Sequence, residues 1–193
     1  MIGMLFVVAH PAGMNALNSG MASSAATATV NAPDCSVVGR PIEDFMAAGA
    51  MEGDAISMLR GTPVATPIPP VSNTPAEPAI VDAVTATMEE VVACVNAGDL
   101  QRMTALFTDN YFYRFFGGIA EADVQRLATP TPLPVDLQTE LVSVDEVMAL
   151  DDGRVSAITQ VGDARALTIF ARDGDRYLVD YSYALADPAT PAP

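Results

Sequence analysis

The sequence predicts an α+β domain in which two to three helices come first and an antiparallel sheet follows. Three observations lead to this prediction. An apolar stripe with helical spacing runs through residues 80–95, the hydrophobic period changes to two after Gln138, and Asp-Gly pairs separate the alternating runs. Helices followed by hairpin-connected strands are typical of a helical layer on one face of an antiparallel sheet.

The 193-residue chain has room for one domain of ordinary size and some additional segments. Composition divides it into five parts. These are a leader and disordered segment (1–33), a small, mostly irregular N-terminal extension (34–61), a Thr/Pro-rich linker (62–78), the α+β domain (79–186) and a disordered tail (187–193).

The beginning of the chain is similar to a secretory signal peptide. Its apolar run, residues 1–9, is too short to cross a bilayer, and A-x-A-like positions follow at residues 26–28. The basic residues that usually come first are absent, which a start codon further upstream would explain. We therefore expect a secreted or cell-envelope protein, cleaved between Ala22 and Pro33, with no stable membrane insertion. The alternative is a disordered apolar N-terminus.

In the extension, residues 35–38 suit a short extended piece. Pro41 suits the first turn of a helix that places Ile42, Phe45 and Met46 on one side. A segment of this size cannot fold alone, so its apolar face must pack against the domain.

The domain begins with a helix whose apolar stripe ends near Val95. Gly98 suits the position just after that helix, and Asp99 suits the N-cap of a second helix. The residues expected to point inward from the second helix are Leu100, Met103, Leu106 and Phe107. A third, short helix is expected over residues 121–128.

Four strands are expected after Gln138, because apolar residues alternate with polar ones and turn residues interrupt them. The expected strands cover residues 142–150, 155–161, 166–171 and 177–185. The acidic pairs at residues 151–152 and 173–175 fit hairpin turns better than calcium sites, since a calcium loop needs more oxygen ligands. No metal and no cofactor is predicted.

Composition narrows the function classes. The net charge of −15 argues against binding to nucleic acid or to anionic membranes. Every basic residue is Arg, so Schiff-base chemistry and a phosphate-loop lysine are excluded. The one histidine, His10, lies in the predicted leader. Any catalysis would therefore use carboxylates, Tyr and Arg.

Three motifs resemble the nuclear transport factor 2-like superfamily (cystatin-like fold), which includes ketosteroid isomerase-like and SnoaL-like proteins. Residues 92–100, VACVNAGDL, are similar to its long helix and "N-x-G-D" break. Residues 106–111, LFTDNY, are similar to its "L-F-x-D-D" entry to the first strand. Residues 173–180, DGDRYLVD, are similar to its "D-G-x-W-x-I-x-D" last strand, with Tyr177 in the Trp place.

The resemblance covers residues 79–186 and implies a cone in which the helices pack on a curved antiparallel sheet. Family members usually form a hairpin after the second helix, whereas here residues 111–116 precede Gly117-Gly118 and another helix. The extension resembles the front part of exported bacterial proteins.

The cone implies a pocket, and five aromatic residues are candidates to line it: Tyr111, Tyr113, Phe115, Phe107 and Tyr181. If residues 111–116 form a strand, alternate side chains point into the cone and outward. The alternative is that these aromatics only fill the core.

Catalysis of the isomerase or hydrolase type would need a carboxylate together with a Tyr or Arg. The candidates are Asp109, Tyr111, Arg114 and Asp180, and no spacing brings two carboxylates together. We therefore favour an exported, non-catalytic module that binds an apolar small molecule or peptide. The alternatives are an enzyme that uses Asp and Tyr, and a structural module that forms homodimers through the exposed sheet face.

The two cysteines are expected to form a disulfide if the protein is exported. At about 100° per residue, Cys94 lies roughly 80° from the line through Val84, Met88 and Val91, at the margin of the core. A Cys35–Cys94 bridge would fix the helix around Phe45 against that flank. The alternative is two free thiols.

Overall fold

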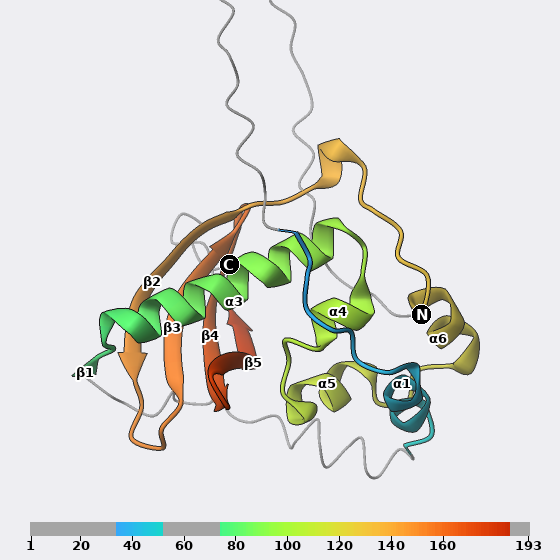
Figure 1. The fold of residues 1–193 in the computed structure, drawn as a ribbon, viewed down its shortest axis with the longest axis horizontal. Coiled ribbons are helices and arrows are strands. Elements are labelled where there is room, and N and C mark those ends of the chain that lie inside the picture. Colours follow the sequence, from blue (N-terminus) through green and yellow to red (C-terminus); the bar gives the residue numbers. More distant parts are fainter. Residues whose placement is uncertain (1–33, 52–73, 186–193) are drawn as a thin grey trace, which may run out of the picture. The chain divides into compact units, whose positions relative to one another are not determined.

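A long helix crosses one face of an antiparallel sheet in the computed structural model of the protein, which describes residues 34–51 and 74–185 (Figure 1). All described residues belong to one compact unit of the chain. The predicted leader with its cleavage window, most of the linker and the tail lie outside the described residues.

The five strands of the described residues form one sheet in the order β1-β2-β3-β4-β5, with every neighbouring pair antiparallel. Their bounds are β1 (Thr74–Pro75), β2 (Leu141–Ala149), β3 (Val155–Val161), β4 (Ala164–Asp173) and β5 (Arg176–Ala184). The β3 strand has the predicted bounds, and β2, β4 and β5 differ from them by one or two residues at their ends. The two-residue strand β1 lies within the sequence assigned to the linker.

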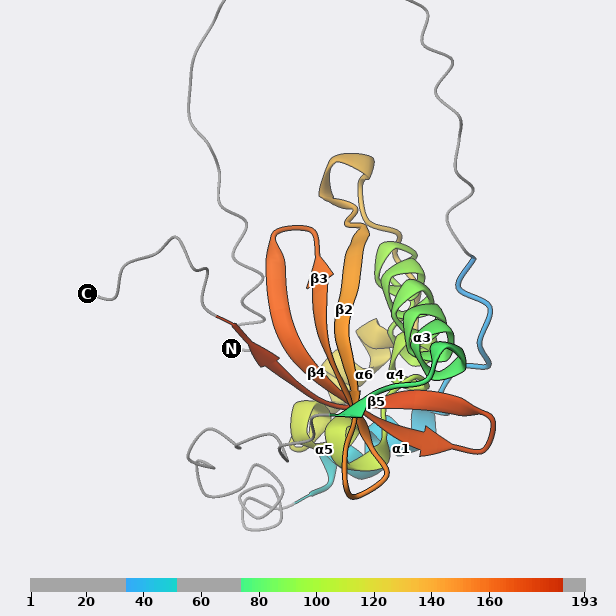
Figure 2. The ribbon, with the colours of Figure 1, turned by 90° about the vertical axis from the view of Figure 1, so that its left-hand side faces the viewer.

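Irregular pairing bends the sheet. The register of β2 against β3 shifts twice, and Glu146 at the second shift has a positive φ of 49°. The register of β4 against β5 shifts between Ile169 and Phe170, which leaves Asp180 as the extra residue. Bulges increase the local twist and bend a strand, and the curved strands are visible in Figure 2. The α+β class with a curved antiparallel sheet is confirmed.

The predicted break between the first two domain helices is confirmed. Helix α3 (Pro78–Asn96) is followed by Gly98 with a φ of 63°, and a Cβ there would collide with the backbone of Thr131. Helix α4 (Leu100–Thr104) begins after Asp99, whose carboxylate accepts a hydrogen bond from the Arg102 amide at 3.0 Å.

The strand that the family resemblance implies at residues 111–116 does not form, because these residues belong to helix α5 (Asp109–Phe116). The Thr108 hydroxyl caps this helix by accepting a hydrogen bond from the Tyr111 amide at 3.2 Å, and Asp109 lies in its positively polarised first turn. The aromatic residues also recur four positions apart, which places them on two helical faces.

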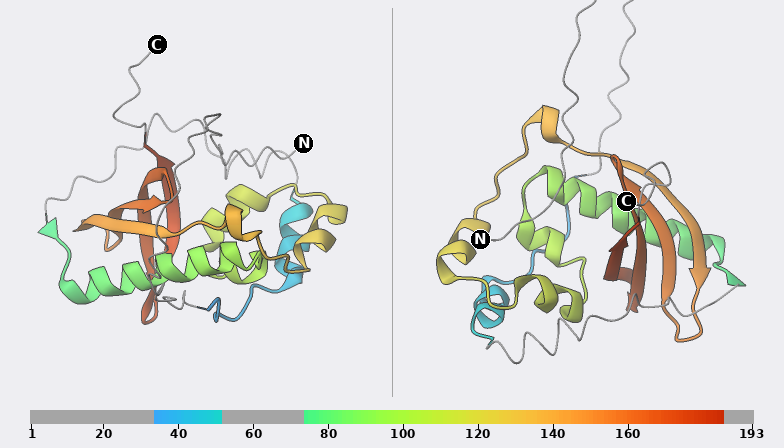
Figure 3. Two further views of the ribbon diagram at one scale, coloured as in Figure 1. Left: turned by 90° about the horizontal axis from the view of Figure 1, so that it is seen from above. Right: turned by 180° about the vertical axis from the view of Figure 1, so that it is seen from behind.

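Helices α1 (Ile42–Gly49), α5 and α6 (Glu121–Leu127) enclose a small second core, with Phe45 and Phe112 fully buried at its centre. The Phe45 ring meets the Phe112 ring edge-on at 5.0 Å. The prediction that Met46 lies on the packed side of α1 is wrong, since Met46 is exposed and Ala48 is buried in its place. Both views in Figure 3 show α1 beside α5 and α6.

The main core lies between α3 and the sheet. Thr87 of α3 also donates a hydrogen bond to the Tyr177 carbonyl of β5 at 2.8 Å, within this core. The buried residues of the core include Val84, Met88, Cys94, Leu106, Val147, Val155, Ala157, Phe170 and Val179. The chain from Leu106 to Thr108 pairs with Val179 of β5, so the sheet edge continues into the start of α5.

The Cys35–Cys94 disulfide is confirmed, with the two Cα atoms 4.7 Å apart. The carbonyl of Cys35 also accepts a hydrogen bond from Arg102, and Val37 is buried in the main core. The bridge therefore holds the start of the extension on α3 and α4. Helix α1 packs instead against α5 and α6, which differs from the expected position on the flank of α3. No helix of the described residues is long and apolar enough to span a bilayer.

Candidate functional site

A pocket of about 240 Å³ opens between α5 and the edge strand β5. Its described lining consists of Tyr111, Arg114, Phe115, Tyr181 and Ser182. We call it the α5–β5 pocket. It is smaller than the sites of roughly 300–1,000 Å³ that hold drug-sized ligands, so it suits a molecule with one or two rings.

The helical geometry of α5 divides its aromatic run between the pocket and the second core. Tyr111, Arg114 and Phe115 are spaced i, i+3, i+4 and face the pocket. Phe112 and Phe116 face the second core. The run therefore both lines a pocket and fills a core, with one helical face for each.

Aromatic rings form a continuous wall on the pocket side. The Tyr111 ring lies 5.0 Å from Phe107, 4.9 Å from Phe115 and 5.9 Å from Tyr181, measured between ring centroids. Tyr181 stacks in turn on Tyr183 at 4.2 Å. Phe115 is 56% exposed and is the outermost of these rings in the wall.

Tyr111 supplies a buried phenol to the pocket. The residue is only 8% exposed, and burial raises the pKa of Tyr111 to about 12, against the opposing influence of the Ser182 hydroxyl. Burial also raises the pKa of Tyr183, assisted by Tyr181 and opposed by the charge of Arg114. At neutral pH the Tyr111 phenol therefore keeps its proton and acts as a hydrogen-bond donor, which makes it a poor general base.

Arg114 contributes the positive charge of the pocket. Its guanidinium carbon lies 4.5 Å from the centre of the Tyr181 ring, in a cation–π contact. Its Nε atom is buried without a hydrogen-bond partner, the only such side-chain atom in the described part of the chain. Buried donors of a cation are rarely left unpaired, so this atom needs an explanation.

Ser182 connects the pocket to a row of buried hydroxyl groups on the sheet. Its oxygen lies 3.4 Å from the hydroxyl of Thr168 on β4, which lies 2.8 Å from that of Thr159 on β3. Thr168 and Thr159 are almost completely buried. This row fixes the polar end of the pocket on rigid strands.

The predicted pocket residues are only partly brought together. Tyr111, Phe115 and Tyr181 line the α5–β5 pocket. Phe107 supports Tyr111 from the main core and faces a second cleft, and Tyr113 packs on Phe112 at 5.2 Å in the second core.

The candidate catalytic carboxylates lie elsewhere. Asp180 accepts a hydrogen bond from Thr108 at 2.8 Å and pairs with Arg154 at 2.9 Å, so both of its oxygens are engaged. The Asp109 carboxylate is 2.7 Å from Arg40 and its side chain is 76% exposed. Neither residue lines the pocket that contains Tyr111.

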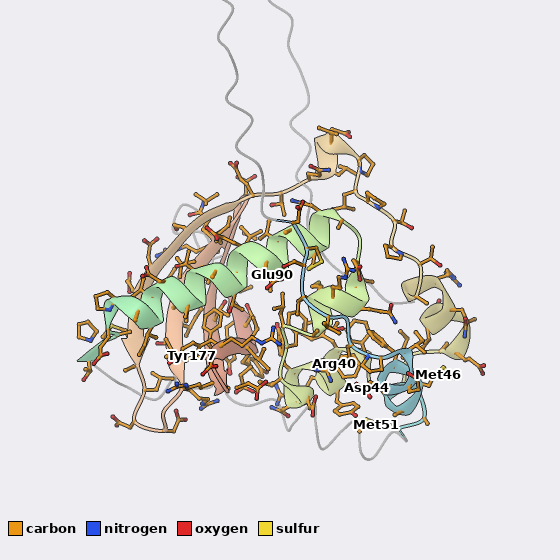
Figure 4. All side chains as sticks on the ribbon, viewed as in Figure 1. Arg40, Asp44, Met46, Met51, Glu90 and Tyr177 are labelled. Carbon is orange, nitrogen blue, oxygen red and sulfur yellow. A yellow bond between two sulfur atoms is a disulfide. The ribbon has the colours of Figure 1, made fainter. Side chains whose placement is uncertain are left out.

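The second cleft, of about 520 Å³, lies where the extension crosses the domain. Arg40 occupies its wall, donates hydrogen bonds to the carbonyls of Thr104 and Phe107, and lies 4.4 Å from the Phe112 ring centre. Figure 4 shows Arg40 next to Asp44, with which it forms a further ion pair at 3.5 Å. Through these contacts Arg40 holds the extension against the domain.

Sequence reasoning missed Arg114 and Ser182 as pocket residues. The sequence marks Arg114 only as a catalytic candidate, whereas the i, i+3, i+4 spacing of Tyr111, Arg114 and Phe115 groups them on one face once the segment is a helix. Ser182 had no sequence signal, because its position depends on the register shift in β5. No cluster of metal-ligating residues occurs within residues 34–51 and 74–185.

Comparison of the chain with protein-family models, with curated proteins and with solved structures yields no significant match.

Proposed function

We propose that this protein is an exported, non-catalytic binding domain of the nuclear transport factor 2-like type, whose ligand is a small aromatic molecule. The observation behind this proposal is the ring-lined α5–β5 pocket, in which Tyr111, Phe115 and Tyr181 surround a space of about 240 Å³. Aromatic walls with a few fixed polar groups are the usual composition of small-molecule sites.

Two features favour binding over catalysis. The described lining of the pocket contains no carboxylate, and the pKa of Tyr111, raised to about 12 by burial, keeps its phenol protonated. A general base must lie within hydrogen-bond reach of the proton that it removes. Asp109 and Asp180, the sequence candidates for that role, are held in ion pairs outside the pocket.

The test is a thermal-unfolding and ligand-observed NMR titration with naphthamide, a flat and uncharged probe. A free probe concentration of 100 times its Kd should stabilise the folded protein by about 2.7 kcal/mol. Phe115→Ala should weaken binding without unfolding the protein, because Phe115 is 56% exposed. Val135→Ala is the matched control, since Val135 is 86% exposed and lies outside the pocket, in the 3₁₀ turn Val135–Leu137.

Absence of saturable binding, or equal binding by the Phe115→Ala variant, would refute the proposal. Conversion of the probe into a product would favour the enzyme alternative instead. A stable dimer in sedimentation experiments, without probe binding, would favour the interaction module.

The Cys35–Cys94 disulfide supports the export part of the proposal, because such bonds persist mainly outside the reducing cytoplasm. Expression with the native upstream region should give mature protein outside the cytoplasm, with a new N-terminus between residues 22 and 33. Cytosolic protein that retains Met1 would contradict export.

A further inference from the structure

We propose that Arg114 makes the α5–β5 pocket selective for aromatic carboxylates, with the ring of the ligand against Phe115 and Tyr181 and its carboxylate on the guanidinium. This inference rests on the proposed function and adds the chemical class of the ligand.

The first argument is the missing partner of Arg114. The chain has 24 acidic and only nine basic residues, so carboxylates are plentiful. Four arginines of the described residues form ion pairs: Arg40, Arg102, Arg126 and Arg154. Three others, Arg165, Arg172 and Arg176, are exposed to water. Among the described residues Arg114 alone is partly buried and has neither an ion pair nor a hydrogen bond from its guanidinium.

The second argument is geometry. The guanidinium carbon of Arg114 lies 4.5 Å from the centre of the Tyr181 ring, and Arg114 also lines the pocket. The N–H groups of a guanidinium can bind both oxygens of a carboxylate. Protein atoms already enclose the Nε atom, so the Nη groups of Arg114 are the ones that can face a ligand in the pocket. A carboxylate there would gain charge-assisted hydrogen bonds from a cation that no carboxylate of the described residues neutralises.

The third argument is the polarity of the rest of the lining. The Tyr111 phenol stays protonated, so it can donate a hydrogen bond to an anion, and the Ser182 hydroxyl beside it is anchored through Thr168. No carboxylate of the described lining would repel the ligand. A cationic ligand would find no counter-charge in this lining and would be repelled by Arg114.

The experiment compares naphthoate with its uncharged isostere naphthamide and with naphthylmethylammonium by isothermal titration of the full mature protein. Naphthoate should bind at least about ten-fold more tightly than naphthamide, a factor at the low end of what one charge-assisted hydrogen bond contributes. The cation should bind more weakly than naphthamide.

Arg114→Gln should reduce naphthoate affinity to the naphthamide level and leave naphthamide affinity within about two-fold, since it removes charge but retains a polar group. Arg114→Lys, which keeps the charge but lacks the fork, should restore only part of the preference. Arg126→Gln is the matched control, because it removes the same charge from another helix, α6, and should leave the affinity for both probes unchanged.

The failures of the two proposals are distinguishable. Equal affinity for naphthoate and naphthamide, or an undiminished preference in Arg114→Gln, would overturn the carboxylate selectivity and leave the binding function intact. A lack of binding by every probe would overturn the proposed function and this inference together.

Discussion

Breaking the Cys35–Cys94 bridge should destabilise the protein by about 4 kcal/mol. The two cysteines are 59 residues apart in sequence. Cross-linking a loop of that length lowers the entropy of the unfolded chain, and in the chain-entropy model this stabilises the folded state by about 4 kcal/mol. For a protein of this size, 1 kcal/mol corresponds to a change in Tm of roughly 2–4 °C, so a decrease of about 8–16 °C is expected.

The perturbation is the double variant Cys35→Ala/Cys94→Ala, compared with wild-type protein before and after reduction. Urea unfolding followed by circular dichroism gives the free energy, and intact mass after alkylation counts the free thiols. Ser36→Ala is the control, because it removes only the exposed Ser36–Glu90 hydrogen bond beside the bridge and should cost under about 0.5 kcal/mol.

Two alkylated thiols in the unreduced folded protein would show that the bridge is absent. An unchanged urea midpoint after reduction would show that the other contacts of the extension suffice. The buried Val37 side chain and the Arg102 hydrogen bond to the Cys35 carbonyl are then the contacts that hold the extension.

Four further predictions concern single side chains. Arg40→Ala should cost about 2–3 kcal/mol in urea unfolding, because two hydrogen bonds to carbonyls and a cation–π contact are lost. Asp109→Asn should cost under about 0.5 kcal/mol, since that carboxylate is mostly exposed. If Arg40→Ala and Asp109→Asn destabilise the protein equally, the exposed ion pair and not the buried contacts of Arg40 holds the extension. Thr108→Ala should cost roughly 1–2 kcal/mol through loss of the α5 cap and of its bond to Asp180, and a neutral result would place the helix start elsewhere. The folded-state pKa of Tyr111, about 12, exceeds its unfolded value of 10.0, so this residue's contribution to stability is intact below pH 10 and is lost as pH rises towards 12. In an ultraviolet titration of the phenols, Tyr111→Phe should remove a step near pH 12, and its persistence would refute the burial argument.

Local signals explain which parts of the fold were predictable. The Gly98-Asp99 break depends on a positive φ and a side-chain cap, and both are properties of the residues themselves. The Asp-Gly turns define the hairpins for the same reason. The disulfide followed from the number of cysteines and the expected compartment.

The helix α5 was missed because two local signals conflict. Aromatic residues favour strands, whereas the Thr108 cap and the four-residue spacing of the rings favour a helix. Packing decides between them, since only the helix buries Phe112 against Phe45 of the distant helix α1. The unpaired state of Arg114 was also unpredictable, because ion pairing depends on which carboxylates the fold brings near.

The most direct test of the binding site is an NMR titration that follows the arginine Nε–Hε resonances while naphthoate is added. We predict that the Arg114 resonance shifts as the pocket saturates and that the ligand ring shows nuclear Overhauser contacts to Phe115 and Tyr181. The Arg40 resonance, in the second cleft, should stay unchanged. Saturable shifts at Arg40 with none at Arg114 would contradict the assignment of the α5–β5 pocket as the ligand site.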